Sequence, residues 1–167
     1  MIFMIIMGID PGYAIVGVGV IRYENNRYVP LEYGAVITDA SQNFEDRLLK
    51  VYDGVRAVIE RWKPDAVSVE ELFFNTNNKT AIFVSEARGV ILLACRQAEI
   101  PIFEYTPLQV KMGVVGYGRA VKQQVMEMTR KLLCLKEIPK PDDAADALAV
   151  AICHANVAGR QNLLRRL

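Results

Sequence analysis

The chain has 167 residues, of which 52% are hydrophobic, and its formal net charge is +1. This length and composition suit one globular domain with its own core and exclude a disordered chain. The apolar run at residues 2–9 is too short to span a bilayer, and no basic stretch or cleavage site flanks it as in a signal peptide. We therefore expect a soluble cytosolic protein, with a single domain over residues 1–157 and a basic tail over residues 158–167.

The small net charge hides an uneven distribution of charged residues. Residues 1–75 carry 7 Lys or Arg against 11 Asp or Glu, whereas residues 106–140 carry 7 against 2. The second segment is either a solvated basic face or a binding surface for a polyanion.

Cysteine chemistry is not expected. The chain has three cysteines, Cys95, Cys134 and Cys153, which is an odd number, and none shows the Cys-x-x-Cys spacing of a zinc site or redox centre. We interpret them as free thiols in the core or near the surface.

The first part of the chain predicts three strands. Residues 3–10 form a dense apolar run, residues 16–21 alternate valine with glycine, and residues 28–37 follow a polar turn. Pro11-Gly12 separates the first two runs. Two short connections in a row indicate an antiparallel meander.

From residue 44 the hydrophobic period changes. Apolar residues recur every three or four positions over 44–62, which predicts an amphipathic helix closed by Pro64. The remaining predicted elements are, in order, a strand at 66–69, a helix at 78–98, a strand at 100–105, a helix at 121–133 and a helix at 144–155.

This order, βββαβαβαα, predicts an α/β fold. Three antiparallel strands followed by helix-connected strands make a mixed five-stranded sheet with helices on both faces, in the strand order 3-2-1-4-5. Functional residues of such sheets gather at the carboxyl ends of strands that are followed by helices.

Acidic residues stand at these strand ends, where burial discourages them. Asp10 ends the first strand, and Glu70 and Glu71 end the fourth. Because the first and fourth strands are expected to be neighbours, these carboxylates are expected at one edge of the sheet.

The last helix opens with a third acidic group. Asp143 and Asp146 are three residues apart and share a face, and so do Asp142 and Asp146, four apart. Asp142 follows Pro141 and fits an ordinary helix start, where free amides and the dipole favour a carboxylate. Asp146 precedes the wholly apolar stretch 147–153 and needs another explanation.

Converging carboxylates repel one another unless they bind protons or a cation. Oxygen ligands suit a hard ion such as Mg²⁺ or Mn²⁺, and two such ions about 4 Å apart can clamp a phosphodiester. The pattern therefore predicts metal-dependent phosphoryl transfer or nuclease chemistry.

His154, the only histidine, lies about 16 Å along the helix from Asp143 and is expected to be structural or solvent-facing.

Several motifs resemble the RuvC Holliday-junction resolvases. They are "GIDPGYAIVGVGVI" at 8–21, "VEELFF" at 69–74, "EARGVI" at 86–91, "TPLQVKMGVVGYGRAVKQQV" at 106–125 and "DDAADALAVAICH" at 142–154. The resemblance follows nearly the whole chain in order. It implies an RNase H-like fold, a homodimer, the RuvAB branch-migration complex as a partner, and Mg²⁺-dependent paired nicking of opposed strands in a four-way DNA junction during recombination and repair.

The resemblance also assigns residues. It places the family's catalytic and metal-binding acids, with two Mg²⁺ or Mn²⁺ ions per site, on Asp10, Glu70, Asp143 and Asp146. It therefore favours Glu70 over Glu71 and Asp143 over Asp142. DNA contacts are expected from Lys111, Lys122, Arg119 and Phe73. Glu71 and the nearly neutral total charge depart from what we expect of a DNA enzyme.

Two other functions remain open at this point. A strand followed by "DxG", here Asp10-Pro11-Gly12, also occurs in the first phosphate loop of actin-like and sugar-kinase ATP-binding proteins, which need a second comparable domain. A catalytically silent junction-binding module is the other alternative. For the homodimer we expect the helix at 78–98 to form the interface, where Ala87 and Gly89 permit close approach.

Overall fold

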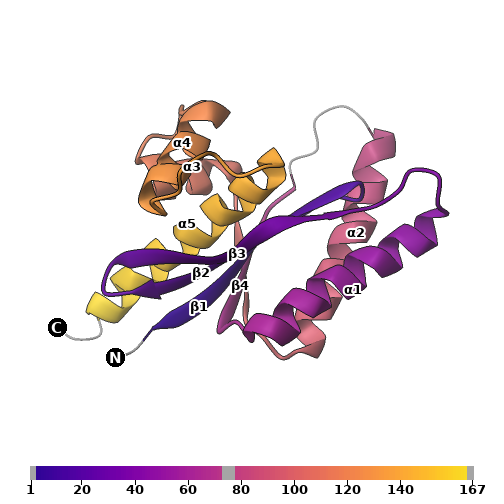
Figure 1. Ribbon diagram of the computed structural model, residues 1–167, viewed down its shortest axis with the longest axis horizontal. Coiled ribbons are helices and arrows are strands. Elements are labelled where there is room, and N and C mark those ends of the chain that lie inside the picture. Colours follow the sequence, from indigo (N-terminus) through magenta and orange to yellow (C-terminus); the bar gives the residue numbers. More distant parts are fainter. Residues whose placement is uncertain (1–2, 73–77, 165–167) are drawn as a thin grey trace.

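A five-stranded sheet covered by helices on both faces forms the molecule (Figure 1). The computed structural model describes residues 3–72 and 78–164. The strands are β1 (Met4–Asp10), β2 (Ile15–Glu24), β3 (Arg27–Ile37), β4 (Ala66–Glu70) and β5 (Ile102–Tyr105). The helices are α1 (Phe44–Trp62), α2 (Asn78–Gln97), α3 (Pro107–Val115), α4 (Lys122–Leu132) and α5 (Asp142–Leu164).

The predicted strand order is confirmed. The sheet runs β3-β2-β1-β4-β5, with antiparallel pairing among the first three strands of the chain and parallel pairing of β1 with β4 and of β4 with β5. β1 therefore lies at the centre, with Asp10 opposite Gly17 of β2. Asp10 and Glu70 end two adjacent parallel strands, as expected from the sequence.

The sheet separates two hydrophobic cores. Helices α1 and α2 cover one face, and α5, with α3 and α4 beyond it, covers the other (Figure 1). Along β1 the side chains alternate between them: Met7 and Ile9 belong to the α1–α2 core, and Ile6 belongs to the α5 core. Each face of the sheet is therefore covered by a separate apolar core.

Helix α5 approaches the sheet unusually closely because glycines face it. A Cβ atom added to Gly8 would lie 2.0 Å from the carbonyl oxygen of Ala147, and one added to Gly17 would lie 2.0 Å from that of Asp143. At Gly19 the added atom would meet the Leu148 side chain at 2.7 Å. Gly17 and Gly19, which weaken a strand in isolation, thus give the last helix its room.

Helix α3 is the element that the sequence analysis missed, so the order is βββαβαβααα. Its start carries a capping box: the Thr106 hydroxyl accepts from the Gln109 amide at 3.1 Å, and the Gln109 side chain accepts from the Thr106 amide at 2.8 Å. Pro107 occupies the first helical position. Gly116, with φ of 77°, ends the helix in the left-handed conformation.

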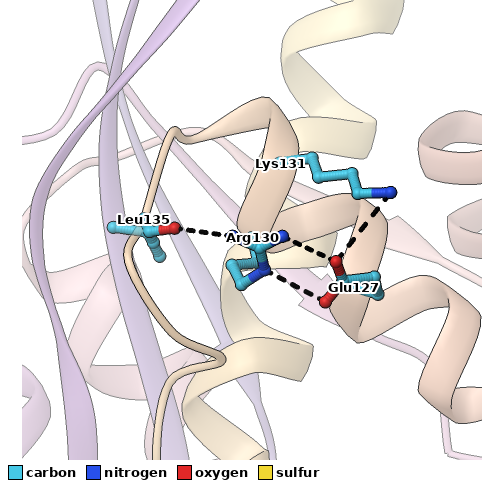
Figure 2. A network of polar contacts seen from close by, with 4 residues as sticks. All are labelled: Glu127, Arg130, Lys131 and Leu135. Atoms are coloured by element: carbon cyan, nitrogen blue, oxygen red, sulfur yellow. Dashed lines mark hydrogen bonds and ion pairs between the residues drawn. The ribbon is translucent and has the colours of Figure 1, made fainter.

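The end of α4 is tied to the following turn by Arg130 (Figure 2). Its guanidinium donates two hydrogen bonds to the Glu127 carboxylate, at 2.6 and 3.0 Å, and a third to the carbonyl oxygen of Leu135 at 3.0 Å. Lys131 lies 3.9 Å from the same carboxylate. This fork holds the turn that leads from α4 towards α5.

Helix α5 extends into the segment that was predicted as a tail, and the three cysteines are free thiols. The tail predicted at 158–167 begins inside α5, which continues to Leu164. Cys95 and Cys153 are buried and Cys134 is exposed, and all three are free thiols, as predicted. Among the helices in the described part of the chain, none combines the length and the apolar character needed to cross a membrane.

The close contact at Gly17 leads to a prediction on stability. Gly17→Ala places a methyl group 2.0 Å from the Asp143 carbonyl oxygen and must displace the first turn of α5. We expect the free energy of unfolding to fall by about 2–3 kcal/mol in urea titrations. Gly34→Ala, in β3 with no atom within 4 Å of the added carbon, is the matched control and should change it by less than about 0.5 kcal/mol. Equal small losses in both variants would contradict this account of the α5 contact.

Candidate active site

The alternation of strand side chains places Asp10 and Glu70 on the α5 face. In β1, Ile6 belongs to the α5 core, so Asp10, four residues on, projects to the same face. In β4, Val67 and Val69 belong to the opposite core, so Glu70 projects toward α5. Both acids therefore project beneath the last helix from the ends of adjacent strands.

The first turns of α5 bring two further acids to the same place. Gly17 pairs with Asp10 across the sheet, and the backbone of Asp143 lies directly over Gly17. Asp146 follows one turn later on the same side of the helix. The glycine contact thus sets the height at which α5 presents its carboxylates to the strand ends.

The four carboxylates influence one another electrostatically. Burial, followed by the charges of Glu70, Asp146 and Asp143, raises the pKa of Asp10 to about 8. Burial and the charge of Asp146 raise the pKa of Glu70 to about 7. Burial also raises the pKa of Asp146. Four negative charges at this place are therefore unfavourable without protons or a cation to offset them.

Two lysines border the acids. Lys122, the first residue of α4, donates from Nζ to Oδ2 of Asp146 at 2.8 Å. Although burial opposes it, this hydrogen bond raises the pKa of Lys122. The charges of Lys122 and of Lys111, which lies on α3, offset part of the rise in the pKa of Glu70. Glu70, Asp146 and the two lysines line one pocket, whose remaining walls are Pro107, Val110, Val125 and Ala149.

The turn that follows Asp10 is braced by residues that the sequence analysis did not single out. The Tyr13 carbonyl oxygen accepts from the Thr38 hydroxyl at 2.7 Å, and the Arg47 Nε donates to that hydroxyl at 2.9 Å. The Arg47 guanidinium lies 4.9 Å from the centre of the Tyr13 ring, which also contacts Phe44 and Phe83. These partners come from α1, from α2 and from Thr38, which directly follows β3, so no local motif could have revealed them.

The disfavoured acids and the other expected DNA contacts are placed differently. Glu71 and Asp142 are not among the charges that shift the pKa of Asp10; Asp142 pairs with Lys140 at 3.2 Å, although its charge also reaches Asp146. Arg119 is exposed in the turn between α3 and α4 and does not line the pocket. Phe73 lies outside the described residues.

His154 has a structural role, which is one of the two roles predicted for it, and it does not face solvent. It is 3% exposed, shares a hydrogen bond of 2.7 Å with the Tyr105 hydroxyl through Nδ1, and packs against the Phe103 ring at 4.2 Å. Burial lowers its pKa to about 4. The histidine therefore joins α5 to β5 as a neutral group.

The acids fit a hard divalent cation by their chemistry. Every side chain of the candidate set offers carboxylate oxygens, the donors that Mg²⁺ and Mn²⁺ prefer. Among the residues that the structure describes, no group of three His, Cys, Asp or Glu side chains is arranged to hold a metal ion. A cation held here would therefore need further oxygen ligands from water or substrate.

Comparison with known proteins assigns the chain to a family. The model described as "Crossover junction endodeoxyribonuclease RuvC" matches residues 6–154. The chain belongs to the RuvC family. A crossover junction endodeoxyribonuclease RuvC from Ruminiclostridium cellulolyticum is 60% identical over 153 residues, covering 92% of each chain.

Solved structures agree with this family and with the RNase H-like fold. RuvC from Thermus thermophilus is 38% identical, covers 95% of this chain and 97% of its own, and superposes with a TM-score of 0.88. The T. thermophilus RuvC in complex with a Holliday junction substrate is 36% identical, covers 94% of this chain and 96% of its own, and superposes with a TM-score of 0.87. Membership of the RuvC family excludes the alternative of an actin-like ATP-binding protein.

The lowered pKa of His154 leads to a prediction on pH dependence. Between pH 6.5 and 4 the unfolded chain binds a proton at this residue that the folded chain does not, so the contribution of His154 to stability falls as pH falls. In His154→Asn an amide oxygen replaces Nδ1 and does not titrate. The stability of the wild type relative to this variant should decrease by roughly 2 kcal/mol from pH 7.5 to pH 5 in urea titrations. Since the other ionisable groups are common to both proteins, a difference independent of pH would contradict the assigned pKa.

Proposed function

We propose that this chain resolves four-way DNA junctions as a divalent-metal-dependent endonuclease, with Asp10, Glu70, Asp143 and Asp146 as the catalytic and metal-binding residues. The observation that carries the proposal is the crowding of half-buried carboxylates, which raises the pKa of Asp10 to about 8, next to a pocket that Glu70 and Asp146 line together with two lysines. Membership of the RuvC family supports the same function, and one structural relative is described in complex with a Holliday junction substrate.

In this mechanism the sheet and α5 supply rigid oxygen ligands. Asp10 and Glu70 stand on adjacent strands, and Asp143 and Asp146 stand on a helix packed directly against those strands. Bound Mg²⁺ or Mn²⁺, two ions in the full site, would activate a water molecule and stabilise the leaving oxygen of the phosphodiester. The carboxylates would orient the water and the scissile phosphate with little rearrangement of the protein.

The lysines have separate tasks in the proposal. Lys122 donates to Asp146 and offsets part of the negative charge of the acids. Lys111 lines the same pocket and is placed to contact a phosphate. Contacts of this kind give affinity without sequence information, which suits recognition of a junction by its shape. Arg119 and Phe73 remain proposed DNA contacts from the family resemblance.

The proposal includes a homodimer, because two opposed strands are cut by two sites related by a twofold axis. Helix α2 offers an open surface for the second copy: nothing lies within 4 Å of a Cβ added at Gly89, and Ile82 and Leu93 are 60% and 54% exposed. Ala87, predicted at this interface, is fully buried in the chain's own core and cannot contribute. The RuvAB branch-migration complex remains a proposed partner.

Paired substitutions test the assignment of the acids. Asp10→Asn, Glu70→Gln and Asp143→Asn should each lower the rate of junction cleavage by at least about 100-fold, because each removes a charged ligand. Junction affinity, measured by gel shift without divalent metal, should stay within about 3-fold of the wild type. Glu71→Gln and Asp142→Asn change neighbouring carboxylates that do not shift the pKa of Asp10, and both should keep wild-type cleavage. Unchanged cleavage by Asp10→Asn would overturn the proposed site.

Removal of metal tests the cofactor. A four-way junction incubated with the protein in EDTA should be bound but not cut, and added Mg²⁺ or Mn²⁺ should restore symmetric nicks in opposed strands. Cleavage that persists in EDTA would contradict the metal requirement. Binding without nicks at any metal concentration would instead favour a silent junction-binding module.

A further inference from the structure

An exposed apolar patch lies between α3 and α4. Leu108, Met112, Tyr117 and Val121 are 60%, 51%, 55% and 60% exposed, and they fall within 14 residues of the chain. We call these four residues the α3–α4 patch. Large exposed apolar side chains that gather in one place mark a contact surface more often than isolated ones do.

The fold gathers these residues into one surface. Gly116, with φ of 77°, turns the chain back after α3. A Cβ atom added to Gly118 would lie 2.6 Å from Cδ1 of Leu108 and 3.6 Å from Sδ of Met112, so the turn lies against both side chains. Tyr117 stands within this turn, and Val121 is the residue that caps α4. The patch is therefore built by a specific turn.

Cations alternate with the apolar residues on this surface. Lys111 lies between Leu108 and Met112 on α3, Arg119 lies between Tyr117 and Val121, and Lys122 follows Val121. In the described part of the chain, Lys111 and Arg119 have no carboxylate within 4 Å, so their charges are free for a ligand. Lys111 and Lys122 also line the pocket that holds Glu70 and Asp146. The patch is thus continuous with the candidate active site.

We propose that the α3–α4 patch binds the deoxyribose rings of the DNA strand next to the scissile phosphate, between the phosphates that the free cations Lys111 and Arg119 contact. This inference rests on the proposed nuclease function. A DNA backbone alternates charged phosphates with apolar sugar faces, which is the pattern that this surface presents. A second copy of the chain fits less well, since its contact would bury the free charges of Lys111 and Arg119.

The salt dependence of binding separates the apolar contact from the ionic ones. Tyr117→Ser should weaken binding to a four-way junction by roughly 5- to 10-fold at every salt concentration, because it removes an apolar contact and no charge. The slope of log Kd against log salt concentration should stay at the wild-type value. Arg119→Gln should lower the magnitude of this slope by about 1, since one phosphate contact is lost.

The control is Leu49→Ser, which removes an exposed apolar side chain from α1 on the opposite face of the sheet. It should leave affinity within about 2-fold of the wild type. Wild-type affinity in Tyr117→Ser, or dissociation of an oligomer in sedimentation of that variant, would overturn this inference while wild-type cleavage keeps the nuclease function. If the wild type itself neither binds nor cuts junctions, the proposed function fails instead.

Discussion

The close contact of α5 with the glycine faces of β1 and β2 is the constraint on which the rest of the structure depends. Gly8 and Gly17 each leave room for a carbonyl oxygen of α5, at Ala147 and Asp143 respectively. A helix that rests on backbone atoms lies nearer to a sheet than one held off by side chains. Residues 147–155 of α5, which follow Asp146, are all buried, so the acidic first turns of the helix cannot move independently of the sheet.

This packing makes the acidic site costly for the folded chain. Desolvation is the largest cause of the raised pKa of Asp10 and of Glu70, and the neighbouring carboxylates add to it. Two features of the chain offset part of the cost. Lys122 donates to Asp146, and the amino-terminal end of α5 favours negative charge at Asp143 through its free amides. In the proposed function, a divalent cation would relieve the remaining repulsion among the carboxylates.

Much of this arrangement could be predicted because it depends on local patterns. Two short turns and two crossovers determine the strand order, and the apolar runs at residues 3–10 and 66–69 predict β1 and β4. Spacing alone could not separate Asp143 from Asp142, since both are helical neighbours of Asp146. That distinction depends on the backbone of Asp143 lying over Gly17, a contact between residues distant in the sequence.

The parts that escaped prediction also have physical causes. Helix α3 has no amphipathic period, because it packs on α5 with only Val110 and Val114 buried, while Leu108 and Met112 stay exposed. Its sequence signals lie at its two ends, in the capping box with Pro107 that begins at Thr106 and in Gly116. The brace around Tyr13 joins three separate elements, so each of its residues is unremarkable where it stands in the sequence.

The nearly neutral net charge is compatible with DNA binding because the charges are unevenly neutralised. In α4, Glu127 binds Arg130 and lies near Lys131, so both cations are occupied by the chain's own structure (Figure 2). Lys111 and Arg119 carry no such partner within the described residues. Since only unpaired cations release counterions fully when they bind phosphate, the salt dependence of junction binding should be smaller than the seven cations at 106–140 suggest. Affinity then depends on where the few free cations stand: the capped helix α3 holds Lys111 at the pocket that Glu70 and Asp146 line, and Arg119 stands in the turn that follows α3.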